Sequence, residues 1–151
     1  TKGDLALQRP GKFRWQVSSP SQQLLIADGN RTWFYDKSLQ QVTVQKQKAV
    51  AQGSPAMLLS GSTQNLLNDF VVTQIPNNTN AQVFNLIPQQ KNNMFKAVVL
   101  SFNQQKLISM KLIDNLGQQT VVNFSQVQVN PAISSATFRF TPPRGVDVVT
   151  E

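Results

Sequence analysis

The chain has 151 residues, which is about the length of one domain and enough to bury a hydrophobic core. It contains no Cys and no His, and only 14% of its residues are charged. Disulfides, thiolate nucleophiles and the commonest general base are therefore excluded, so we expect no enzyme. The net charge of +7 favours anionic partners, but the basic residues are dispersed and form no nucleic-acid-binding arm.

Amide side chains take the place of charged ones, with 20 Gln and 13 Asn in the sequence. No acidic metal-binding loop can be written from the seven acidic residues, so neither a metal nor another cofactor is expected. No segment reaches the ~18 apolar residues of a membrane span, and stable membrane insertion is not expected. The chain begins inside an alternating, strand-like segment, which we interpret as a mature or trimmed product.

The first third of the chain alternates apolar and polar residues with a period of two. Turn residues separate these runs, and the sequence Asp28-Gly29-Asn30 is a strong hairpin signal. The pattern predicts an antiparallel meander of short strands at residues 4–8, 13–17, 24–27, 32–35 and 42–44.

The middle of the chain changes character. Ser54 followed by Pro55 predicts a helix start, and Gly61 predicts its end. A second short helix is predicted after residues 62–63. Both segments are too apolar for ordinary surface helices, so we expect them to pack on an apolar surface.

Strands resume at Phe70 and continue to the C-terminal region. They are predicted at residues 70–75, 83–87, 94–102, 107–113, 120–129 and 137–140, with a helical turn near residues 131–135. The sequence Pro142-Pro143-Arg144-Gly145 is predicted to end the regular structure. Nine to ten short, regularly spaced strands indicate a mainly β sandwich or barrel.

Several of these strands are apolar on both faces. Val98 and Leu100 share one face of their strand, while Ala97 and Val99 occupy the other. A half-solvated sheet is typically apolar on one face only. Two interpretations stay open from the pattern: burial on both sides in a sandwich, or a curled sheet that helices or a ligand partly cover.

Five motifs occur together in one order and spacing: RPGKFRW at residues 9–15, LIADG at 25–29, WFYD at 33–36, QVT at 41–43 and FRFTPPRGV at 138–146. In these motifs the chain resembles the LolA family of periplasmic outer-membrane lipoprotein carrier proteins, which are lipoprotein chaperones. The resemblance implies an unclosed antiparallel β-barrel, a curved sheet whose apolar concave face is covered by a lid of short helices. Residues 1–151 are then one carrier domain.

The resemblance also implies a function in the periplasm. Such a carrier takes acylated lipoproteins from an inner-membrane ABC transporter, holds their acyl chains and delivers them to an outer-membrane receptor. The alternative is a related half-barrel lipid-binding module, either the outer-membrane lipoprotein receptor or the sensor domain of an envelope-stress regulator.

Two residues match family positions with implied roles, and three more are candidates for the lid. Arg9 matches a position for lid closure and release, where a guanidinium can donate to several lid carbonyl groups at once; the alternative is a solvated Arg at a strand end. Phe13 matches a position for cargo loading or partner contact; the alternative is a core Phe. Met57, Leu58 and Leu59 are the lid candidates; the alternative is an ordinary core helix.

The implied groove has its own candidate residues: Trp15, Phe34, Val98, Leu100, Ile108 and Met110. Asp28 and Gly29 are expected to serve turn formation. Family members carry an amphipathic helix and a first strand upstream of the position that matches Thr1, so we expect this chain to lack them. The full-length form is expected to be a monomer, whereas an exposed strand edge in the trimmed chain invites association.

Overall fold

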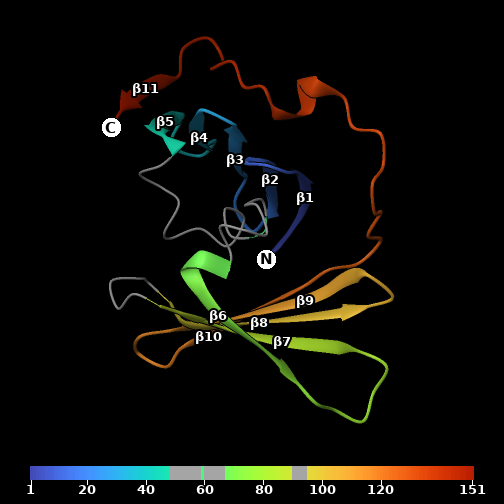
Figure 1. Ribbon diagram of the computed structural model, residues 1–151. Helices are drawn as coiled ribbons and strands as arrows, with labels where there is room; N and C mark the ends of the chain where they lie inside the picture. The colour runs from blue at the N-terminus through green and yellow to red at the C-terminus, as the bar shows by residue number, and fades with distance from the viewer. Residues whose placement is uncertain (48–58, 60–66, 90–94) are drawn as a thin grey trace. The chain divides into compact units, whose positions relative to one another are not determined.

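The computed structural model describes residues 1–47, 59, 67–89 and 95–151 (Figure 1). The chain divides into two compact units, one formed by Thr1–Ser62 with Ile133–Glu151 and the other by Thr63–Ala132. Each unit contains one sheet, and neither sheet closes into a barrel. The predicted mainly β, unclosed antiparallel architecture is therefore confirmed, and eleven strands are described where nine to ten were predicted.

The first unit holds a six-stranded sheet with the order β1-β2-β3-β4-β5-β11. Its first five strands form the predicted meander, because each alternating run is followed by a short turn. Their bounds are Lys2–Gln8 for β1, Lys12–Ser19 for β2, Gln23–Asp28 for β3, Arg31–Asp36 for β4 and Gln41–Lys46 for β5. Neighbouring strands among these five pair antiparallel.

The C-terminal region differs from the prediction in several places. The strand predicted at residues 120–129 ends early, because β10 spans Gln119–Asn123. The helical turn predicted near residues 131–135 begins only at Ser135. Residues 137–140 do not form a strand, since the 3-10 helix η1 occupies Ser135–Phe138. Regular structure also continues beyond Gly145, because β11 (Asp147–Thr150) pairs parallel with β5. A parallel partner at a sheet edge is reached by a long connection, which local sequence patterns do not reveal.

The first sheet is apolar on both faces. On one face Ile26 and Val42 are buried, and Trp33 and Tyr35 contact the Phe140 ring at centroid distances of 5.6 and 5.9 Å. The segment that contains η1 and Phe140 therefore covers this face. The opposite face carries its own buried pair and is described with the functional site below.

The second unit holds a five-stranded antiparallel sheet with the order β10-β9-β8-β7-β6. Gln104 and Gln105, with φ angles of 51° and 68°, turn the chain tightly from β8 to β9. Two successive positive φ angles are typical of a type I′ hairpin. The strand bounds are Phe70–Ile75 for β6, Gln82–Pro88 for β7, Phe95–Asn103 for β8, Lys106–Asp114 for β9 and Gln119–Asn123 for β10.

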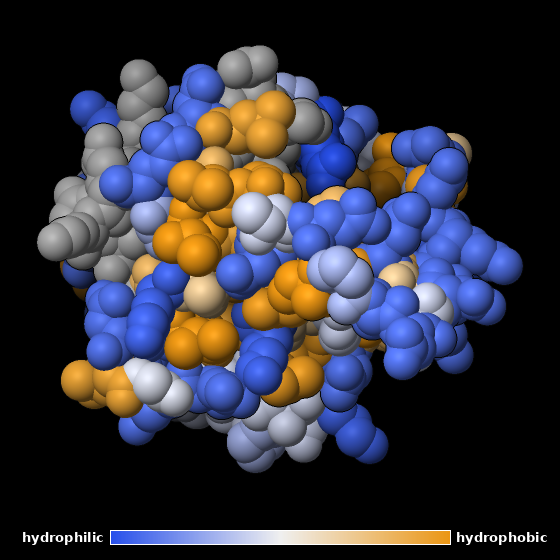
Figure 2. All heavy atoms as spheres, turned by 60° about the horizontal axis from the view of Figure 1, so that its bottom comes forward, coloured by the Kyte–Doolittle hydropathy of each residue, from blue (hydrophilic) through white to orange (hydrophobic). Residues whose placement is uncertain are grey.

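This second sheet is also apolar on both faces. One face is buried across β7, β8 and β9, where Leu86 pairs with Val98 and Val98 pairs with Leu112. The other face is open, and Val71, Ile87 and Val121 on it are 51%, 47% and 56% exposed. Figure 2 shows apolar side chains gathered in patches on one side of the molecule, with polar side chains between them.

Candidate functional site

The site begins at the turn between β1 and β2, which consists of Arg9, Pro10 and Gly11. The Arg9 Nε–H donates a hydrogen bond of 3.0 Å to the carbonyl oxygen of Leu59, fifty residues further along the chain. The Leu59 side chain is 4% exposed. An exposed arginine is thus bonded to the backbone of a buried residue, although sequence separation alone would leave the two unrelated.

Two aspects of this contact bear on the predicted lid. The resemblance implies a lid contact at Arg9 in which a guanidinium can use several donors at once, whereas one such bond, from Nε, is present within the described residues. Met57 and Leu58, the other predicted lid residues, lie outside the described residues. The hydrogen bond between Arg9 and Leu59 therefore connects two of the predicted site residues. Their role in closing a lid stays a prediction.

A second turn lies at the same end of the sheet, between β3 and β4. The Asp28 carboxylate accepts hydrogen bonds from the backbone N–H groups of Asn30 at 2.9 Å and Arg31 at 2.8 Å, and from the Trp33 indole N–H at 3.2 Å. Gly29 adopts a φ of +98°, which favours glycine. The expected turn chemistry of Asp28 and Gly29 is confirmed.

These hydrogen bonds set the charge state of Asp28. Partial burial raises the pKa of its carboxyl, but the three donors favour the carboxylate more strongly. The pKa of Asp28 therefore lies below its ordinary value of 3.8. The turn is held by a carboxylate at any pH above that ordinary value.

Phe13 lies on one face of the first sheet, near the start of β2. It is 0% exposed, it pairs with Ala27 across β2 and β3, and Leu7, Trp15 and Leu25 pack against the pair. The geometry agrees with the core interpretation of Phe13 in this conformation. A direct contact with cargo or a partner would need this face to open.

The predicted groove residues of the first unit lie on that same face. Trp15 pairs with Leu25, and Leu25 pairs with Phe34, so the three side chains form one row beside Phe13. Trp15 is half-buried, and Phe34 is 37% exposed. The structure thus brings Phe13, Trp15 and Phe34 together as one apolar surface.

The predicted groove residues of the second unit lie on β8 and β9. Val98, Leu100 and Met110 are buried on one face of the sheet, and Leu100 pairs directly with Met110. Ile108 is 37% exposed and lies beside the register shift of the β8–β9 pair. Three of these four candidates therefore belong to one buried surface, and the fourth is at its margin.

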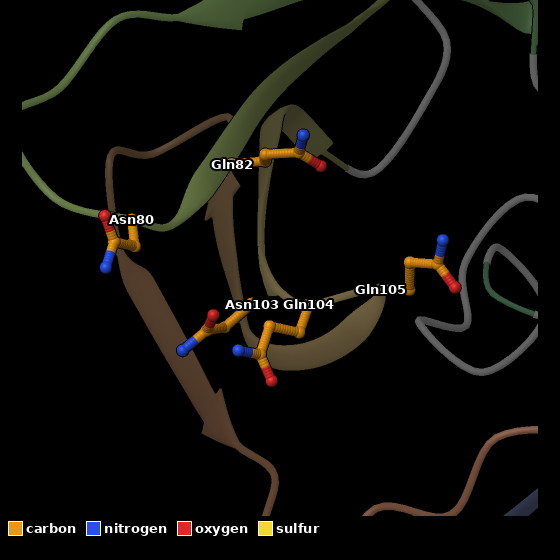
Figure 3. A pocket seen from close by; sticks show the side chains of 5 residues that line it. All are labelled: Asn80, Gln82, Asn103, Gln104 and Gln105. Carbon is orange, nitrogen blue, oxygen red and sulfur yellow. The ribbon is translucent and has the colours of Figure 1, made fainter.

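The structure also contains a depression of 420 Å³ in the second unit (Figure 3). Five amide side chains line it: Asn80, Gln82, Asn103, Gln104 and Gln105. None of the predicted site residues lines it, and burying its amide groups against an acyl chain would cost hydrogen bonds to water. We therefore assign the candidate site to the apolar faces and the Arg9 turn, not to this depression.

Among the described residues, no group of three or more acidic, His or Cys side chains could hold a metal ion. No helix in the same part of the chain is long and apolar enough to cross a membrane.

Two residues beside the site have no counterpart among the sequence predictions. Gln47 follows β5, and its side-chain amide bonds to both turns, at Gly11 and Gly29. Thr32 is 3% exposed, and its hydroxyl has no hydrogen-bond partner in the described part of the structure. No sequence signal distinguishes Gln47 from the other Gln residues, and Thr32, which lies between Arg31 and Trp33, carries no clear sequence signal of burial.

The geometry defines a mainly β protein whose two sheets are each apolar on both faces, without a polar catalytic cluster among the described residues. A family model described as "Outer membrane lipoprotein carrier protein LolA" matches residues 1–141. An outer-membrane lipoprotein carrier protein of Legionella pneumophila (strain Lens) is 42% identical over 151 residues, covering 100% of this chain and 74% of the relative.

Two other relatives carry the same name. The protein of Pseudomonas paraeruginosa (strain DSM 24068 / PA7) is 40% identical over 151 residues, which are 100% of this chain and 72% of the relative. The protein of Dechloromonas aromatica (strain RCB) has the same identity and coverage. The chain belongs to the LolA family of outer-membrane lipoprotein carrier proteins. Its membership supports a role as a lipoprotein carrier.

Proposed function

We propose that this chain is a single periplasmic carrier domain that binds the acyl chains of lipoproteins released by an inner-membrane ABC transporter and delivers them to an outer-membrane receptor. The observation that carries the proposal is the match to the carrier family over residues 1–141. The relatives' names favour the carrier over the receptor or the stress sensor of the same fold type. Binding and transfer require no chemical step.

Apolar surface is the physical requirement of this task. Each acyl methylene that leaves water is worth ~0.8 kcal/mol, so a diffusing lipoprotein needs a protein surface that shields its chains. We propose that the groove-lining candidates shield acyl chains on the apolar face of their own sheet: Trp15 and Phe34 in the first unit, and Val98, Leu100, Ile108 and Met110 in the second. Phe13 takes part in cargo loading from within the first face, as that face rearranges around the cargo.

Release is the second requirement, because a carrier that binds too tightly cannot hand over its cargo. We propose that Met57, Leu58 and Leu59 belong to a lid and that the Arg9–Leu59 hydrogen bond, here called the latch, favours its closed state. A closed state that excludes cargo competes with binding and lowers the apparent affinity by the closed fraction. The latch is then a means of release.

The proposal is tested by replacing Arg9 in the full-length protein. Arg9→Leu removes the donor, so the closed state weakens, cargo loads as before or better, and handover slows. A hydrogen bond from a charged group is worth ~1.5–3 kcal/mol, less at an exposed side chain, so we expect release to slow about three- to tenfold. The measurement is the rate at which a bound lipoprotein passes to purified receptor.

Arg144→Leu is the matched control, since it makes the same change at an exposed arginine for which the described structure shows no hydrogen bond. It removes the same charge and should leave release unchanged. Equal release by wild type and Arg9→Leu would remove the latch from the mechanism. Failure of the full-length protein to hold any acylated lipoprotein in solution would overturn the carrier function itself.

A further inference from the structure

The turn that carries Arg9 lies at an edge of its sheet. Among the described residues, β1 is the outermost strand of the sheet and pairs with β2, and the last ladder pair before the turn joins Gln8 to Lys12. An edge strand has hydrogen-bond partners on one side only. Within the described residues, contacts from the inner side of the sheet therefore help to fix the position of the Arg9 turn.

The Gln47 side chain supplies such a hold. Its Nε2 donates a hydrogen bond of 2.5 Å to the Gly11 carbonyl oxygen in the Arg9 turn. Its Oε1 accepts a hydrogen bond of 3.1 Å from the Gly29 N–H in the β3–β4 turn. The Gln47 backbone N–H also donates to the Asn30 carbonyl oxygen at 3.1 Å. Gln47 thus connects the Arg9 turn to the turn between β3 and β4 by hydrogen bonds.

The arrangement requires an amide side chain at Gln47 and a residue without a side chain at Gly11. A donor and an acceptor are needed at the two ends of one planar group, and among side chains of this length only Gln offers both at any pH. Gly11 has a φ of +76°, and a Cβ there would lie 3.0 Å from the Gln47 Nε2. Glycine at this position therefore lets the amide reach the backbone.

We propose that Gln47 is a positioning residue for Arg9: by fixing the Arg9 turn to the β3–β4 turn, it places the guanidinium Nε–H against the Leu59 carbonyl oxygen. The two contacts share one short turn. Arg9 donates to the Leu59 carbonyl oxygen, and the carbonyl oxygen of Gly11, two residues later, accepts from Gln47. The consequence for transport rests on the proposed role of the latch, whereas the positioning itself does not.

The positioning is tested on the empty full-length protein by NMR, through hydrogen exchange of the Arg9 side-chain Nε–H. Gln47→Met keeps the side-chain length and removes both hydrogen bonds. We expect exchange of the Arg9 Nε–H to become about two- to tenfold faster, as for the loss of one ordinary hydrogen bond. Gln8→Met, an equal change at an exposed residue beside the same turn, should leave the exchange rate unchanged.

A second variant guards against a general loss of structure. Gln47→Glu keeps an acceptor for the Gly29 N–H but cannot donate to Gly11, so it should also speed the exchange at Arg9 while leaving that at the Trp33 indole N–H unchanged. Unchanged Arg9 exchange in both Gln47 variants would overturn the inference. Faster exchange at both Arg9 and Trp33 would also overturn it, by making Gln47 a general support of the sheet.

Transport gives an independent readout through a double variant. If Gln47 acts through Arg9, Gln47→Met slows release in the wild-type background and has no further effect when Arg9→Leu is already present. If the double variant slows release by the product of the two single fold-changes, the residues act independently and the inference is overturned. Faster Arg9 exchange with normal release in every variant would leave Gln47 as the positioning residue and refute the latch, so the two proposals fail by different results.

Discussion

Replacing Phe13 tests how far the candidate site is also the core of the first unit. Phe13 is 0% exposed and packs with Ala27, Leu7, Trp15 and Leu25, so Phe13→Ala removes a ring from a filled space. Substitutions of this type cost ~3–5 kcal/mol through lost burial and the cavity that remains. Because a domain is stable by only ~5–15 kcal/mol, the variant should lose a large share of its stability.

The assay is urea unfolding of the full-length protein, followed by tryptophan fluorescence. Phe34→Ala is the control, because Phe34 lies on the same face but is 37% exposed, and its loss should cost well under half as much. An unfolding midpoint for Phe13→Ala equal to that of wild type, or equal to that of Phe34→Ala, would refute the core assignment.

A conservative variant separates stability from function. Phe13→Leu keeps an apolar side chain of similar volume and should cost less than ~1.5 kcal/mol. If Phe13 also takes part in cargo loading, this variant loads less lipoprotein at a temperature where it is fully folded. Normal loading by folded Phe13→Leu would restrict Phe13 to the core.

Three further changes have outcomes set by single contacts. Asp28→Asn should lower stability near pH 6 and remove a pH dependence: the lowered pKa of Asp28 adds stability above about pH 3.8 that wild type loses as the pH falls through the folded-state pKa. Urea unfolding at several pH values measures this, with Asp4→Asn as the control, and an equal loss of stability in acid by wild type and Asp28→Asn would contradict it. Thr32→Val removes a buried hydroxyl without a partner and should raise the thermal unfolding midpoint by the equivalent of ~1–2 kcal/mol; a lower midpoint would show that the hydroxyl is satisfied. Gly3→Ala places a Cβ 2.1 Å from the Gln16 carbonyl oxygen, so amide exchange in β1 should accelerate, and unchanged exchange would mean that the strand pair adjusts freely.

Sequence patterns predicted the strands correctly where side-chain alternation and turn residues mark them within a few residues. The predicted strand at residues 70–75 coincides with β6, and the Asp28-Gly29-Asn30 hairpin is present between β3 and β4. Side-chain alternation and turn chemistry act over a few residues, so they can be read without a partner strand. The same patterns failed at residues 137–140, where a β-prone run forms part of η1 and the following segment.

The candidate site was predictable only in part. The resemblance to the carrier family pointed to Arg9, and the short apolar segment made Leu59 a lid candidate; the structure joins the two by a hydrogen bond. Alternation placed Trp15 on the same face of the strand as Phe13, but it could not show that Phe13 is fully buried while Phe34 is partly exposed. Exposure depends on what covers a face, and that covering comes from segments distant in sequence.

By itself, the sequence determined that this protein is mainly β, that it contains neither Cys nor His, and that several of its strands are apolar on both faces. These properties follow from composition and short-range periodicity. Only the tertiary structure decided that β11 pairs parallel with β5 and that Gln47, one of 20 Gln, bonds to two turns. Both depend on contacts between residues far apart in the chain. Whether such a long loop closes is decided by the free energy of the whole fold, so the local sequence does not reveal it.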